Sequence, residues 1–286
     1  IEIIENTCER CWLMVIVKLW GGLGNQLFQY AFGYAIAKER NTTLALDLSF
    51  YENQPGNVGK RVIDIDRMNI ASYHRYTASP IIRFLSNRYI GAITRNLPQF
   101  EVKAGNDLHY FKEPLHKYVC SLPKHPHMYF DGYWQASDYF SMYRDDVIRM
   151  FTSKVGYSDE VLFIAEDLKG AESVAIHMRK GDFGNGRLRK VGHLLEPEYY
   201  HQAVRYMREH LIEPIFYVFS DDSTWAKTVL GQSDDILYVG DICKTNALDD
   251  LHLISSCRNG IMSASTFSWW GNWLRRENGT IVVPAG

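Results

Sequence analysis

The feature that most constrains the fold is a strand, a glycine turn, a helix and a second strand in immediate succession near the start of the chain. The apolar run MVIVKLW at 14–20 is followed by the turn GGLGNQ at 21–26. Apolar residues recur at helical spacing over 27–40, which predicts a helix, and TLALDLSF at 43–50 is predicted to form a strand. This order predicts one half of a doubly wound α/β sheet.

The later part of the chain alternates strands and helices more clearly. Strands are expected at 173–179, 214–222, 236–241 and 260–262, and helices at 196–210, 223–231, 247–257 and 265–278. Before them, 137–151 is expected to be a helix and 152–172 a linking region. The pattern predicts a second α/β half.

We therefore expect two βα-rich domains with a cleft between them, at residues 14–155 and 156–286. Met14 stands at the start of the first strand, so residues 1–13 are expected to be an upstream extension. This layout is typical of nucleotide-using transferases and of two-domain dehydrogenases.

Composition excludes several partners. The net charge is -2, and without a basic surplus no nucleic acid is expected. The apolar run near the start is too short to cross a bilayer, so no integral membrane segment is expected, although peripheral membrane contact stays open. Cysteines stand at 8, 11, 120, 243 and 257, an odd and scattered set that favours a reducing, cytoplasmic setting. The lone Cys8-x-x-Cys11 pair has no second half, so no metal is expected.

The run IHMRKGDF at 176–183 carries the first candidate site. Ligands of open α/β sheets bind where strands end, and Arg179 ends one. Its guanidinium can grip a diphosphate in bidentate fashion. Asp182 can orient Arg179 or accept a proton. The alternative is a solvated salt-bridge cluster at a strand end.

The run STFSWWGNWL at 265–274 carries the second candidate site. A helix that begins there, with Ser265 as its N-cap, would offer free backbone N–H groups and the positive end of its dipole to a phosphate. A capped, buried amphipathic helix is the alternative. Trp269, Trp270 and Trp273 are interpreted as packing residues.

Two other motifs compete with this interpretation. Gly22-x-Gly24-x-x-Leu27, with Asp47 on the next strand, imitates a dinucleotide fingerprint but lacks the third glycine. An NAD-dependent two-domain oxidoreductase therefore stays an alternative. DID at 64–66 could bind a metal, but such three-residue matches are common by chance. DD at 221–222 could also bind a metal, but a strand-end turn with an acidic helix start explains it.

Several segments together resemble the inverting α-1,2-fucosyltransferases of glycosyltransferase family 11. They run in the family's order and cover 14–284. The segments are GGLGNQLFQYAFGYAIA, LDLSFY, DGYWQ, IHMRKGDF, FSDDSTWAK and DLHLISSC followed by STFSWWGNWL. One departure is visible: the family commonly has Asn where this chain has Ala264.

The resemblance implies a GT-B fold, in which two Rossmann-like domains face each other across a cleft. GDP-fucose is the implied donor substrate, with no metal and no cofactor. The more distant protein O-fucosyltransferases share the His-x-Arg element and use it on the donor diphosphate. By this likeness the expected catalytic residues are Arg179 and Asn25, and Asp182 of the same strand-end run is the candidate general base. The expected donor-binding residues are Gly22, Gly24, Asn25, His177, Arg179, Asp250, Ser265, Thr266 and Phe267.

The implied reaction moves L-fucose from GDP-fucose to the 2-OH of a galactoside, with inversion, in glycan or surface polysaccharide synthesis. The nucleotide is expected mostly on the second domain and the acceptor mostly on the first. A bacterial, cytoplasmic enzyme is expected. Because Ala264 departs from the family pattern, a catalytically inactive GDP-sugar or glycan-binding protein also stays open.

Overall fold

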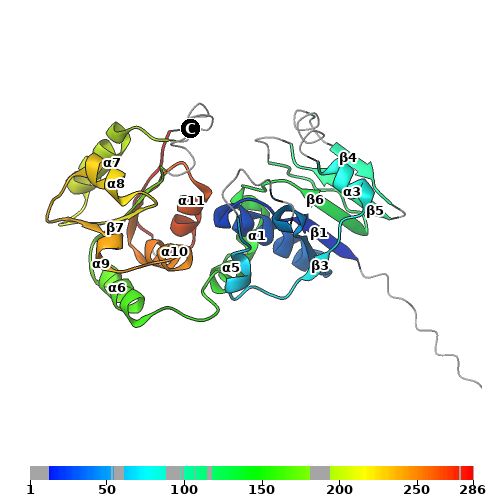
Figure 1. Ribbon diagram of the computed structural model, residues 1–286, viewed down its shortest axis with the longest axis horizontal. Helices are drawn as coiled ribbons and strands as arrows, with labels where there is room; N and C mark the ends of the chain where they lie inside the picture. Colours follow the sequence, from blue (N-terminus) through cyan, green and yellow to red (C-terminus); the bar gives the residue numbers. More distant parts are fainter. Residues whose placement is uncertain are drawn as a thin grey trace, which may run out of the picture. The chain divides into compact units, whose positions relative to one another are not determined.

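The first apolar run forms a central strand because its side chains are buried on both faces of a parallel sheet. The computed structural model describes residues 13–52, 54, 61–87, 97, 100–105, 107–114, 118–180, 194–276 and 278–285. The chain divides into two compact units, and Figure 1 draws both. Unit 1 comprises residues 1–64 and 70–147, and unit 2 comprises 65–69 and 148–286.

Unit 1 is built on a sheet with strand order β3-β2-β1-β6-β5-β4. All neighbouring strands pair in parallel except β4, which pairs antiparallel with β5 at the edge. The strands are β1 (Met14–Lys18), β2 (Thr43–Asp47), β3 (His74–Tyr76), β4 (Phe100–Lys103), β5 (Leu108–Lys112) and β6 (His127–Asp131).

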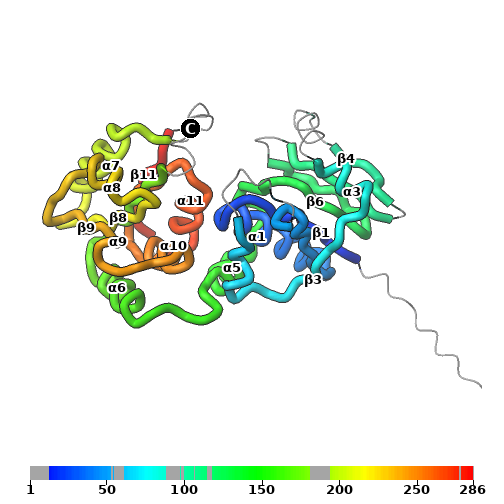
Figure 2. Tube along the Cα trace, viewed as in Figure 1, coloured from blue at the N-terminus to red at the C-terminus, as the bar shows by residue number. Residues whose placement is uncertain are grey.

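Helices cover both faces of this sheet. Helix α1 (Leu23–Glu39) lies on one face, where a Cβ at Gly33 would stand 2.8 Å from Val17 Cγ2. Helix α3 (Pro80–Leu85) brings Ile82 onto the other face, against Ile16 and Tyr129. The tube in Figure 2 shows β1 and β6 at the centre of this unit. Among its described residues, the other helical segments of unit 1 are α2 (Ser49–Glu52), the 3-10 turns Ser137–Tyr139 and Ser141–Tyr143, and the start of α5 (Arg144–Met150).

Unit 2 is built on a parallel sheet with strand order β11-β10-β7-β8-β9. The strands are β7 (Ser173–Met178), β8 (Ile215–Ser220), β9 (Ile236–Tyr238), β10 (Asn259–Ile261) and β11 (Ile281–Val282). The helices are α6 (Asp159–Gly170), α7 (Pro197–His210), α8 (Ser223–Leu230), α9 (Val239–Ile242), α10 (Ala247–Ser256) and α11 (Thr266–Trp273).

The core of unit 2 has the two layers of a doubly wound sheet. On one face, Tyr200 and Met207 of α7 pack with Ile176 of β7. On the other face, Leu168 of α6 and Leu253 of α10 pack with neighbouring strand residues. All six residues of β7 are buried, which fits its position as an interior parallel strand.

Local contacts explain why unit 2 begins before the boundary that we expected near residue 155. Met68 forms an antiparallel bridge with Ser153, and the N–H of Lys154 donates to the carbonyl of Arg67 at 2.8 Å. The Phe151 ring contacts Trp270 of α11 with centroids 5.1 Å apart. These contacts join 65–69 to 148–155, and 148–155 to helix α11 of unit 2.

Several expected elements differ from the structure. The expected strand 236–241 ends at Tyr238 and continues as α9, and the expected strand 43–50 ends at Asp47, before α2. Helix α1 begins at Leu23, because Gly22 acts as its N-cap and the turn needs only Gly21 and Gly22. The expected helix 137–151 is two 3-10 turns followed by α5. The expected linking region contains α6, which Ser158 caps by accepting a hydrogen bond from the N–H of Val161. Over the described residues, no helix is both long and apolar enough to cross a membrane.

Candidate functional site

The end of β7 and the start of α11 lie side by side in unit 2. Strand β10 pairs with β7, with Ile261 opposite Ile176, and leads directly to α11. His177 Nδ1 lies 2.8 Å from Ser263 Oγ, and its ring centroid lies 5.3 Å from that of Phe267. The two motifs that the sequence singled out therefore meet at the carboxyl edge of one sheet.

His177 is a buried, neutral group at this edge. Burial, assisted by the nearby charge of Arg179, lowers the pKa of His177 to about 3. A neutral imidazole can accept or donate one hydrogen bond at each nitrogen, which suits the contact with Ser263. His177 is therefore placed to hold the strand-end segment rather than to exchange protons near neutral pH.

We expect the imidazole of His177 to keep its neutral NMR chemical shifts throughout the range from about pH 5 to 8, where an ordinary histidine titrates. In the unfolded chain His177 binds a proton below its ordinary pKa of about 6.5. The folded state therefore loses stability relative to the unfolded state as the pH falls below that value. A titration of His177 with a midpoint near 6.5 in the folded protein would contradict this assignment.

The N-terminus of α11 is open at this site. Ser265 is the N-cap, with an extended backbone, but among the described residues its side chain makes no capping hydrogen bond. The first turn carries no acidic side chain. Ser268 is occupied differently, because its hydroxyl accepts the N–H of Ser263 at 3.1 Å. The helix thus presents amide groups and two hydroxyls, those of Ser265 and Thr266, at its positive end.

Asp250 lies in the first turn of α10, whose residues Leu253 and Ile254 belong to the core cluster that Phe267 packs against. Burial is the largest cause that raises the pKa of Asp250 to about 6, with Asp249 adding to it and a hydrogen bond from Thr245 opposing it. A half-buried carboxyl on the helix next to α11 can accept hydrogen bonds from a ligand's N–H groups.

Arg179 follows β7 directly and is half-buried. The next residue, Lys180, is held by both acids of the DD pair: its N–H donates to Asp221 at 2.9 Å, and its ammonium to Asp222 at 2.8 Å. Asp222 also caps α8. This pair therefore has a structural explanation that needs no metal. Asp182 lies outside the described residues.

The remaining predicted residues, Gly22, Gly24 and Asn25, belong to unit 1. The backbone of Gly21 has φ +86°, and a Cβ there would lie 2.6 Å from Asn25 Nδ2. Glycine therefore allows the Asn25 side chain to fold back over the turn. The buried Gln26 donates to the carbonyl of Val62 at 2.8 Å and accepts the N–H of Asp64, so its role is to hold a neighbouring segment.

Sequence reasoning missed the charged groups at the carboxyl edge of the unit 1 sheet. Buried Asp131, at the end of β6, lies 2.9 Å from the ammonium of Lys112 and accepts the hydroxyl of Tyr110 at 2.7 Å. Glu113 follows β5 and accepts the N–H groups of Tyr133 and Trp134 at 2.6 and 2.9 Å. The DGYWQ motif was a signal for this contact, because its glycine leaves space for Glu113.

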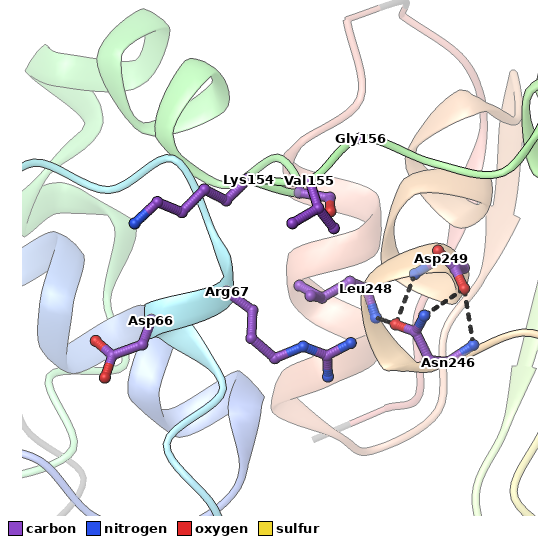
Figure 3. Close-up of a pocket in the computed structure, with 9 residues that line it drawn as sticks. Asp66, Arg67, Lys154, Val155, Gly156, Asn246, Leu248 and Asp249 are labelled. Atoms are coloured by element: carbon purple, nitrogen blue, oxygen red, sulfur yellow. Dashed lines mark hydrogen bonds between the residues drawn. The ribbon is translucent and has the colours of Figure 1, made fainter.

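A cavity of about 270 Å³ lies in unit 2, and Asp66 of the DID motif is among its lining residues (Figure 3). It is lined by Asp66, Arg67, Ser153, Lys154, Val155, Gly156, Asn246, Leu248 and Asp249. Asn246 and Asp249 are engaged in the capping box of α10, drawn as dashed lines. The cavity therefore lies where the 65–69 segment meets the start of this helix.

A group of possible metal ligands lies at the amino edge of the unit 1 sheet. Within the described residues, Glu101 Oε1 lies 3.0 Å from His109 Nδ1 and 2.7 Å from His125 Nε2. The two imidazole rings are stacked, with an interplanar angle of 7°. Their in-plane lone pairs do not converge on one point, so hydrogen bonding to Glu101 explains the cluster.

Solved structures with a similar fold are fucosyltransferases. NodZ from Bradyrhizobium superposes with a TM-score of 0.53 at 14% identity, covering 92% of this chain and 94% of NodZ. A mutant of Arabidopsis thaliana FUT1 in complex with GDP gives a TM-score of 0.54 at 14% identity, covering 94% of this chain and 70% of that protein. Both units of this chain thus have the Rossmann-like build of a GT-B glycosyltransferase.

The model of glycosyl transferase family 11 matches residues 14–286, and the chain belongs to this family. An α-1,2-colitosyltransferase from Escherichia coli is 30% identical over 95% of this chain and 91% of the relative. Galactoside α-(1,2)-fucosyltransferase 2 from Oryctolagus cuniculus is 23% identical over 91% of this chain and 67% of the relative. The chain is therefore a glycosyltransferase, as the sequence motifs predicted.

Proposed function

We propose that this chain transfers L-fucose from GDP-fucose to the 2-OH of a galactoside, with inversion at the anomeric carbon. The observation that carries this proposal is the contact between the end of β7 and the start of α11 in a family 11 chain. Its relatives include galactoside α-(1,2)-fucosyltransferases. A NodZ structure that was soaked with GDP-fucose supports a donor of this class for the fold.

In the proposed reaction the acceptor oxygen attacks C1 of fucose while the bond from C1 to the diphosphate breaks. Negative charge grows on the diphosphate. Arg179 and the amide groups at the start of α11 stabilise this charge, which is the largest contribution that we expect from the protein. Asp250 accepts hydrogen bonds from guanine N–H groups, and His177 holds the strand end. Gly22, Gly24 and Asn25 help to bind the donor, with Asn25 near the fucose that is transferred.

The test is a donor and acceptor screen. GDP-fucose, GDP-mannose and UDP-sugars are offered with several galactosides, and the linkage of the product is determined. We expect an α-1,2-linked fucosyl product from GDP-fucose alone. NAD binding, or GDP binding without turnover, would instead support the oxidoreductase or the inactive sugar-binding protein.

A colitosyl donor is a second candidate, because the relative at 30% identity is an α-1,2-colitosyltransferase. Colitose lacks one hydroxyl that fucose has, and a site built to hydrogen-bond that hydroxyl discriminates strongly against the sugar without it. A direct comparison of kcat/KM for GDP-fucose and GDP-colitose distinguishes the two donors. A bacterial, cytoplasmic setting stays part of the proposal.

Transfer should persist in excess EDTA. The proposal neutralises the departing diphosphate with a guanidinium and backbone amides, so no divalent ion is required. Initial rates with and without EDTA measure this directly. Complete loss of activity that manganese restores would contradict the prediction and favour a metal site at DID (64–66).

A further inference from the structure

Five side chains with the chemistry of a sugar-binding site lie at the carboxyl edge of the unit 1 sheet. Strands β1, β5 and β6 end together there, because the parallel register places Val17 opposite Phe130 and Lys112 opposite Asp131. The chain segments that follow these strands carry two aromatic rings, two amides and a carboxylate. These are Trp20, Tyr133, Asn25, Gln135 and Glu113.

The aromatic rings form an accessible platform. Trp20 and Tyr133 have ring centroids 4.2 Å apart, and Tyr133 is 36% exposed. The indole of Trp20 is held in place, because its N–H donates to the carbonyl of Gly132 and its backbone N–H donates to Gln29. Aromatic faces that are fixed and partly exposed suit the apolar face of a sugar ring.

The two amides lie beside this platform. Gln135 Nε2 donates to Asn25 Oδ1 at 3.1 Å, which joins the turn after β6 to the first turn of α1. The contact leaves the amide nitrogen of Asn25 and the carbonyl of Gln135 as further hydrogen-bonding groups. Sugar hydroxyls both donate and accept, so a pair of amides of this kind matches them.

Glu113 completes the group. Both hydrogen bonds that its side chain makes with described residues go to Oε2, from the N–H groups of Tyr133 and Trp134. They hold a turn in which Trp134 has φ +58°, a left-handed conformation that is costly for a bulky residue. A Cβ at Gly132 would lie 2.4 Å from Glu113 Cβ, so the turn is shaped around this carboxylate.

The surroundings of Glu113 raise the pKa of its carboxyl group. Burial raises the pKa of Glu113 to about 7, the two backbone N–H groups and Lys112 oppose this rise, and Asp131 adds to it. Glu113 also interacts with the phenol groups of Tyr133 and Tyr139. A carboxylate of this kind can take a proton near neutral pH.

We propose that this edge is the acceptor subsite: the Trp20–Tyr133 platform stacks on the galactoside, and Glu113 Oε1 accepts the proton of the attacking hydroxyl. The proposal rests on the proposed function. The acceptor O–H bond breaks as its oxygen bonds to fucose C1, the proton goes to Glu113, and the C1–O electron pair leaves with GDP. Glu113 then replaces Asp182 as the proton acceptor.

Glu113→Gln is the first test, because glutamine keeps an oxygen for the N–H groups of Tyr133 and Trp134 but cannot take the proton. We expect kcat to fall by about a hundred- to ten-thousandfold, with GDP affinity unchanged. In the wild type the rate should rise with pH through about 7, because the base must be deprotonated, and this rise should vanish in the variant. Glu101→Gln, at the opposite edge of the sheet, is the matched control and should leave the rate and the pH profile unchanged.

Tyr133→Ala is the second test. We expect the KM for the galactoside to rise at least about tenfold, because the variant loses the aromatic ring that stacks on the sugar, with little change in GDP affinity. Tyr206→Ala removes an exposed tyrosine from α7, outside the proposed subsite, and is the control that should keep the wild-type KM. An unchanged KM in Tyr133→Ala, or wild-type turnover in Glu113→Gln while Asp182→Asn is inactive, would overturn the subsite.

Failure of the proposed function gives a separate result. If the wild type transfers fucose from no donor, saturation-transfer NMR with methyl β-galactoside measures the subsite alone. Binding that Tyr133→Ala abolishes would support the subsite without fucosyl transfer. Absence of binding to the wild-type protein would overturn it.

Discussion

Replacing Arg179 with alanine should abolish transfer while the protein stays folded. Arg179 directly follows β7, at the edge where the open N-terminus of α11 lies. Its planar guanidinium can bind two oxygens of the departing diphosphate at once, as their charge grows in the transition state. Losing one such group typically lowers kcat by about a hundred- to thousandfold. Initial rates at saturating donor and acceptor, with circular dichroism spectra, measure both parts of the prediction.

Two further variants make this result specific. Arg179→Lys keeps the positive charge but loses the bidentate geometry, so its rate should lie between those of the wild type and the alanine variant. Arg205→Ala removes an exposed arginine from α7 in the same unit and should leave kcat unchanged. Wild-type turnover by a folded Arg179→Ala protein would show that the diphosphate is neutralised elsewhere.

The arrangement of this region could be predicted because its signals are local. The apolar run of β7 is followed at once by Arg179, and the polar start of α11 follows β10 after a short link. Parallel strands end at one edge, so the order of elements alone brings the two motifs close. Their chemical roles stay predictions until the variants are measured.

Other elements could not be predicted, because tertiary contacts override their local pattern. Gly24 looks like part of a turn in the sequence, yet α1 begins at Leu23, with Gly22 as its N-cap, and the side chain of Gln26 is held by a partner far along the chain. The third glycine of a dinucleotide fingerprint is absent, but Gly33, about three turns into the helix, allows close packing against Val17 and Leu44. The six-residue fingerprint at 22–27 therefore does not include the glycine at which the helix packs closely against the sheet.

Glu113 illustrates the same limit for the site. It stands in no motif, and its partners lie about twenty residues further along the chain. The glycine of DGYWQ is the one sequence feature that reflects the position of Glu113, because a side chain at Gly132 would collide with it. A sequence shows that such a glycine is present, but the strand register decides which side chain occupies the space beside it.

The carboxyl edge of the unit 1 sheet also contains a buried charge, the carboxylate of Asp131. Asp131 is 1% exposed, and Lys18 and Lys112 lie 3.8 and 2.9 Å from it. Burial alone would raise the pKa of Asp131, but the two ammonium groups, with hydrogen bonds from Lys112 and Tyr110, lower it instead. The carboxylate thus stays ionised and balances the positive charges of two largely buried lysines.

Asp131→Asn should therefore destabilise unit 1 by about 3–5 kcal/mol, the usual cost of removing one partner from a buried ion pair. Urea denaturation near neutral pH measures this. Because the folded-state pKa is lowered, the stabilisation is present above the ordinary carboxyl pKa of about 4 and is lost as the pH falls through the folded value. The difference in the free energy of unfolding between variant and wild type should shrink in acid.

Glu166→Ala, which breaks the exposed pair with Lys169, is the control and should change the free energy of unfolding little. An equal loss in both variants, or a difference that persists in acid, would mean that Asp131 acts through its shape and not its charge.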